Sequence, residues 1–128
     1  MKLNALGAAI AFTLFALGAK TADYHQVKDP KDVDELLSRS ESLGEIVAFK
    51  YLCLAEQDKE LAAAYGTYLG LLTSDGYILT RAKRAFVTGA SRTPKCDDPG
   101  AQLSSIAGSA GILAGMKNFA ETGAWIRQ

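Results

Sequence analysis

The chain has 128 residues, and its 14 basic and 14 acidic side chains cancel. This length corresponds to one domain with a core of modest size. A chain without net charge provides no global field that would attract nucleic acid or an anionic membrane surface, so we expect a single domain that does not bind nucleic acid.

The N-terminus has the pattern of a secretory signal peptide. Lys2 precedes an apolar run over residues 5–19 that contains no charge. Small residues favour cleavage after Gly18, with cleavage after Ala19 as the alternative. The run is shorter than the ~20 apolar residues that span a bilayer. We therefore expect residues 1–19 to be a signal peptide and the mature protein to be exported, either periplasmic or extracellular.

The mature chain contains two cysteines, Cys53 and Cys96. An exported protein with an even number of cysteines usually pairs them, which predicts one structural disulfide. The alternative, a reactive thiol or a metal ligand, needs neighbours that the sequence lacks. There is no CxxC motif, and the only histidine, His25, lies in residues 20–28, which we expect to form a flexible tail. We therefore predict neither a metal nor a cofactor.

Helix start and stop signals divide residues 29–128 into four or five helices, which predicts an all-α bundle. Asp29-Pro30 has the pattern of an N-cap and a first helical residue, and it begins a short first helix. Ser42 and Glu45 fit a capping box for a second helix, although the boundary between the two is open by several residues. The second helix is apolar on most sides, so we expect it to be central to the bundle.

Two further helices follow. Asp58 is the expected N-cap of the third, in which apolar residues recur at helical spacing from 61 to 72. A break at residues 73–76 precedes a fourth helix over about 77–88, which Gly89 is expected to end. The tyrosine, isoleucine, phenylalanine and valine of the fourth helix would also tolerate a strand.

A loop over residues 90–99 precedes the last helix, from Gly100 to about Phe119, which is rich in small residues. Glycine is unfavourable inside a helix, so its glycines need a reason. Gly111 and Gly115 stand four apart on one face and predict close backbone packing against a neighbouring helix, with a membrane dimer motif as the alternative. Trp125 is expected to pack on the bundle as a lid.

The sequence contains no catalytic constellation. A catalytic triad needs a fixed imidazole, and His25 is expected to be mobile. Paired acids occur at residues 32–35 and at Asp97 and Asp98. Both groups stand at the start of a helix, where the helix dipole favours negative charge. We therefore expect no enzymatic activity.

Basic side chains between residues 81 and 95 form the main charge asymmetry of the chain. They are either a solvated helix face or a docking patch for an acidic partner. Nearby tyrosines suit protein interfaces, because an apolar ring and a polar tip are both useful there. The predicted partner-binding residues are Arg81, Lys83, Arg84, Arg92, Lys95, Tyr65, Tyr68 and Tyr77.

Export, small size, a cross-link and the lack of catalytic motifs together predict a protein that binds another protein stoichiometrically, such as an inhibitor or an immunity protein. The alternative is a membrane-associated or membrane-active protein whose Gly- and Ala-rich last helix contacts the bilayer.

Overall fold

The computed structural model describes residues 23–126, except for the side chains of residues 99 and 101–106, so the predicted signal peptide lies outside the described residues. Within the described range the chain is all-helical and contains no strand, as predicted. Its four helices are α3 (Pro30–Leu54), α4 (Lys59–Leu72), α5 (Gly76–Ala90) and α6 (Pro99–Thr122).

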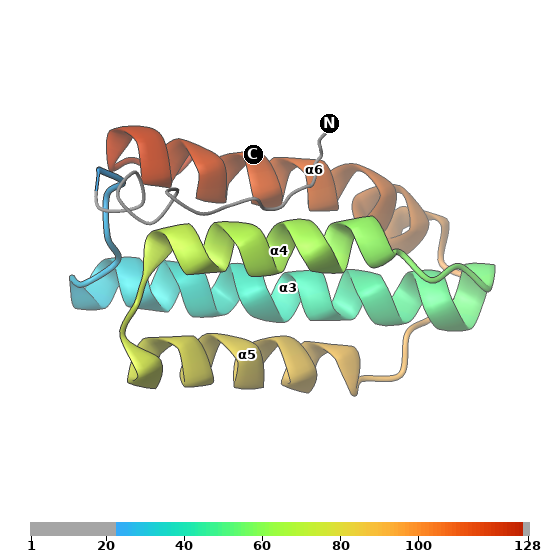
Figure 1. The fold of residues 1–128 in the computed structure, drawn as a ribbon. Helices are drawn as coiled ribbons and strands as arrows, with labels where there is room; N and C mark the ends of the chain where they lie inside the picture. Colours follow the sequence, from blue (N-terminus) through green and yellow to red (C-terminus); the bar gives the residue numbers. More distant parts are fainter. Residues whose placement is uncertain (1–22, 127–128) are drawn as a thin grey trace.

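The four helices lie side by side along a common direction (Figure 1). Following the chain, α3 and α5 run one way and α4 and α6 run the other way. Helix α3 packs against both α5 and α6, while α4 packs against α6. The core between them contains side chains from three helices that are almost completely buried: Leu36 and Leu43 of α3, Leu69 and Leu72 of α4, and Met116 of α6.

Tyr65 connects α4 to two other helices through the core. Its hydroxyl oxygen lies 2.8 Å from Ser40 Oγ in α3 and 3.1 Å from the carbonyl oxygen of Ala82 in α5. Burial raises the pKa of this hydroxyl, so it stays protonated and hydrogen-bonded. Its ring stacks on that of Phe86, with centroids 4.9 Å apart.

The first two predicted helices are one continuous helix, α3. Its start is as predicted, because the Asp29 side chain accepts a hydrogen bond from the Lys31 N–H. The capping box predicted at Ser42 and Glu45 is not formed, since both residues lie inside α3 and Glu45 pairs with Arg92 instead. Tertiary contacts thus override a local start signal.

The last turns of α3 extend beyond the core. Tyr51, Leu52 and Leu54 are 56%, 59% and 38% exposed, whereas Phe49 is only 3% exposed. The prediction that this apolar stretch is buried on most sides therefore holds only as far as Phe49. The end of α3 leaves apolar surface open to solvent.

Two glycines let α3 and α5 approach backbone to backbone. A Cβ atom at Gly44 would overlap the carbonyl oxygen of Phe86, and one at Gly89 would overlap that of Glu41. Helix α5 ends at Ala90, so Gly89 is its penultimate residue and does not itself end the helix, in contrast to the prediction. The role of Gly89 is to admit the neighbouring helix, which no local signal reveals.

Gly115 in α6 accommodates a side chain, whereas the sequence predicts a backbone contact there. A Cβ atom would overlap the guanidinium of Arg39, which is 8% exposed. Arg39 donates to Glu35 and to the carbonyl oxygen of Ile126, both at 2.7 Å, and stacks 5.1 Å from the centre of the Trp125 ring. Trp125 thus packs on the bundle as predicted.

No helix in the described part of the chain is long and apolar enough to cross a membrane.

The segment before α3 is packed against the bundle. Val27 is 1% exposed, and its N–H donates to the carbonyl oxygen of Leu72 at 2.8 Å. The N–H of His25 donates to the carbonyl oxygen of Ala120, also at 2.8 Å. The prediction of a flexible tail does not hold for residues 23–28, because these contacts bind them to the ends of α4 and α6.

Asp58 caps α4 as predicted and also joins it to α3. Its carboxylate binds Lys50 Nζ at 2.8 Å and accepts from the Leu61 N–H at 2.9 Å. Both hydrogen bonds favour the charged form, the one from Lys50 most, and hold the pKa of Asp58 below its ordinary value of 3.8. The side chain is 24% exposed, so solvent screens the pair only in part.

Replacing Asp58 by alanine is expected to lower the free energy of unfolding by about 1–2 kcal/mol, because the cap and the ion pair are lost together. The lowered pKa means that the stabilisation by this carboxylate is fully present above pH 3.8 and is lost as pH falls through the folded value. Urea unfolding of the wild type and of Asp58→Ala, at neutral pH and at a pH below the folded pKa of Asp58, checks both statements. If the substitution destabilised the protein as much in acid as at neutral pH, the ionised carboxylate would not be the source of the stabilisation.

Candidate functional site

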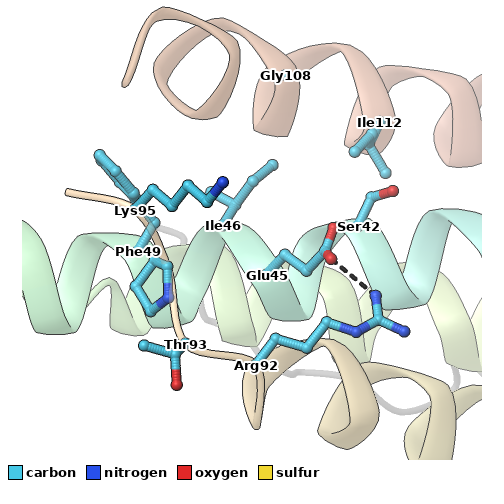
Figure 2. Close-up of a pocket in the computed structure, with 10 residues that line it drawn as sticks. Ser42, Glu45, Ile46, Phe49, Arg92, Thr93, Lys95, Gly108 and Ile112 are labelled. Atoms are coloured by element: carbon cyan, nitrogen blue, oxygen red, sulfur yellow. Dashed lines mark hydrogen bonds and ion pairs between the residues drawn. The ribbon is translucent and has the colours of Figure 1, made fainter. Parts of the chain in front are cut away.

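A cleft lies between α3, α6 and the loop formed by residues 91–98 (Figure 2). Its volume is about 450 Å³. Ligand pockets in proteins commonly measure ~300–1,000 Å³, so the cleft is large enough for a small ligand or for a few side chains of a partner. It is lined by Ser42, Glu45, Ile46, Phe49, Arg92, Thr93, Pro94, Lys95, Gly108 and Ile112.

The floor of the cleft is apolar. Ile46 and Phe49 of α3 are 7% and 3% exposed, and Ile112 of α6 is half-buried. Gly108 of α6 faces Ile46 across the cleft, since a Cβ atom at Gly108 would lie 3.5 Å from Ile46 Cδ1. Because Gly108 has no side chain, this part of the cleft stays open. The floor is therefore set by packed helices and exists before any ligand arrives.

The loop that forms the wall of the cleft is held at both ends. The predicted disulfide is present and joins Cys53 at the end of α3 to Cys96, with Cα atoms 5.2 Å apart. At the other end, Arg92 pairs with Glu45, at 2.7 Å, and with Glu41. Hydrogen bonds to Glu45 and Glu41 raise the pKa of Arg92 above its ordinary value. The wall is thus fixed to α3 without filling the cleft.

Lys95 stands between these two anchors. Figure 2 shows its ammonium group between α3 and α6, over the apolar floor. Arg92, at the opposite rim, is matched by two carboxylates, whereas Lys95 forms no ion pair with any residue that the structure describes. The cleft therefore offers apolar contact together with one unmatched positive charge.

The predicted partner-binding residues do not form one surface. Arg92 and Lys95 line the cleft. Tyr65 is 6% exposed and hydrogen-bonded inside the core, so its assignment to a binding surface is wrong. Tyr68 is half-buried and packs against the same core. Tyrosine supplies both an apolar ring and a hydroxyl, and here the bundle itself uses them.

The other predicted residues lie on α5. Tyr77 is 71% exposed, and the guanidinium of Arg81 lies 5.5 Å from the centre of its ring. These two residues border a shallower hollow of about 270 Å³ beside the start of α3. Lys83 and Arg84 are exposed on the same helix. This surface lies apart from the cleft, and none of its residues lines both hollows.

The acidic groups that the sequence singles out have structural contacts. Asp32 accepts a hydrogen bond from Trp125 Nε1 at 3.1 Å, and Asp98 accepts one from the Gly100 N–H at 2.9 Å. Among the described residues, no three histidine, cysteine or acidic side chains are grouped so that they would hold a metal ion.

Sequence reasoning missed the floor of the cleft. Ser42, Glu45, Ile46 and Phe49 follow the 3 and 4 spacing of one helix face, so their common side was visible in the pattern. The sequence does not show which segments cover that face, because the loop and α6 lie about 45 to 70 residues further along the chain. No family model, curated protein or solved structure matches the chain.

Proposed function

We propose that the protein is exported and acts by binding another protein stoichiometrically, as an inhibitor or an immunity protein does, and that the partner occupies the cleft. The observation that carries this proposal is an apolar cleft whose wall is fixed to α3 at both ends by the Cys53–Cys96 disulfide and by Arg92. A wall that is already ordered reduces the entropy lost on binding, which favours affinity.

The open end of the cleft favours a protein over a compact small molecule. Leu52 stands three residues beyond Phe49 on α3, which places it next along the same helix face. It is 59% exposed, so the apolar surface continues out of the cleft. A segment of a partner protein would cover the floor and Leu52 together, whereas small ligands bind where most of their surface is enclosed.

Filling the cleft is expected to abolish partner binding. In Gly108→Leu the new side chain occupies space above Ile46, and the backbone of α6 gains helix propensity. Gly66→Leu is the matched control, because a Cβ atom at Gly66 meets nothing within 4 Å. The wild type and both variants, oxidised and without residues 1–19, serve as bait for extracts of the source cells and their medium, read by mass spectrometry.

The proposal predicts one stoichiometric partner captured by the wild type and by Gly66→Leu, and a loss of at least about tenfold with Gly108→Leu. Circular dichroism checks that all three proteins are equally helical. Equal capture by Gly108→Leu would contradict binding at the cleft. Membrane association through α6 predicts a different result, flotation with liposomes of phosphatidylcholine and phosphatidylglycerol and no protein partner, and that result would overturn the proposal.

A further inference from the structure

Resting on the proposed function, we infer that the partner enters the cleft with an apolar side chain that stands next to a carboxylate, and that Lys95 selects for this carboxylate. The distribution of charge around the cleft supports this assignment.

The charges that line the cleft divide into a matched group and an unmatched one. Arg92 is bound by both Glu41 and Glu45, so its positive charge is more than compensated within the protein. Lys95 projects over the floor, and neither Asp97 nor any other described residue forms an ion pair with it. A ligand in the cleft therefore meets in Lys95 a positive charge that forms no ion pair with a described residue.

Occupation of the cleft changes the surroundings of that charge. An apolar group on Ile46, Phe49 and Ile112 displaces water from beneath the ammonium of Lys95. Lys95 is exposed, so only part of its hydration is lost, but this loss is unfavourable and a carboxylate at hydrogen-bond distance compensates for it. A partner without an acid beside its apolar side chain thus binds less well, so Lys95 acts mainly through discrimination between partners.

The length of the exposed apolar surface indicates that the carboxylate belongs to a polypeptide. A free amphiphile that pairs with Lys95 would fill the cleft, but it would leave Leu52 uncovered. A polypeptide segment that continues along α3 covers both Leu52 and the neighbouring apolar end of the helix, where Tyr51 and Leu54 are also exposed. We therefore commit to an acidic-apolar segment of a protein partner.

Two peptides of nearly equal shape test the inference, acetyl-Gly-Leu-Asp-Gly-amide and acetyl-Gly-Leu-Asn-Gly-amide. They are titrated into the oxidised mature protein while the methyl signals of Ile46 and Ile112 are followed by NMR. We expect the aspartate peptide to bind about tenfold more tightly than the asparagine peptide, and the difference to shrink as salt is added. Lys95→Gln is expected to remove the preference, and Lys117→Gln, the same charge change at an exposed position of α6 that does not line the cleft, to keep it.

Equal affinity for the two peptides overturns the inference, as does a preference that survives in Lys95→Gln or the lack of methyl shifts with either peptide. Partner capture with Lys95→Gln separates this result from a failure of the proposed function. If Gly108→Leu loses the partner while Lys95→Gln keeps it at full affinity, the cleft binds a protein but Lys95 does not select it. If the wild type captures nothing, the proposed function itself fails.

Discussion

Alanine in place of Gly44 or Gly89 is expected to lower the free energy of unfolding by about 2–3 kcal/mol, or to prevent folding. At either position the added methyl group would overlap a backbone carbonyl oxygen of the opposite helix. Backbone has no alternative rotamer, so α3 and α5 have to move apart. That movement disturbs Tyr65, whose hydroxyl contacts both helices at 2.8 and 3.1 Å. Urea unfolding followed by circular dichroism measures the loss.

Gly66→Ala and Gly70→Ala are the matched controls. Both glycines lie inside α4, and a Cβ atom at either position meets nothing within 4 Å. Since alanine is the better helix former, each control is expected to stabilise the protein by about 0.5–1 kcal/mol. The same substitution should therefore have opposite signs on α4 and at the α3–α5 contact. A Gly44→Ala protein as stable as Gly66→Ala would contradict the close approach of α3 and α5.

Removing the disulfide is the second change with a large expected effect. The Cys53–Cys96 bridge spans 43 residues, for which the loop-closure model gives about 4 kcal/mol of stabilisation. Small domains are stable by only about 5–15 kcal/mol, so this bridge is a large share of the total. We expect Cys53→Ser with Cys96→Ser to unfold at much lower urea concentration than the oxidised wild type. A loss below about 1 kcal/mol would contradict this estimate.

The same double variant also tests how the cleft is built. Without the bridge, Arg92 is the remaining anchor of the wall, and its ion pairs are exposed and screened by salt. Partner affinity should then fall more steeply with ionic strength than it does for the wild type, because salt screens the ion pairs that still order the loop. An equal salt dependence in the double variant and the wild type would mean that the wall is ordered without the bridge.

Helix starts could be predicted from the sequence where an N-cap residue and the N–H that it binds are close in the chain. Asp29 and Asp58 each accept a hydrogen bond from a backbone N–H within three residues, so a short window of sequence contains the whole interaction. The disulfide was predictable because only two cysteines were available to pair. Ser42 shows the limit of such reasoning, since a capping pattern was present but tertiary contacts kept α3 continuous.

The candidate site was predictable only in part, because its pieces come from distant segments. Arg92 and Lys95 were singled out for their charge, and both line the cleft. Ile46 belongs to the apolar stretch that the sequence predicts to be central to the bundle, and nothing in α3 indicates that α6 leaves a gap above it. Tyr65 was misassigned for the converse reason, because its two partners in the core lie 25 and 17 residues away.

The most direct test of the central claim is site-specific photo-cross-linking from the cleft. A photoreactive phenylalanine analogue replaces Thr93, an exposed residue that lines the cleft, and in a second protein it replaces Thr80, which is exposed on α5. We expect irradiation in the extract to join the Thr93 variant to a single protein and to leave the Thr80 variant unlinked. A cross-link from Thr80 with none from Thr93 would place the partner on α5 and contradict binding at the cleft.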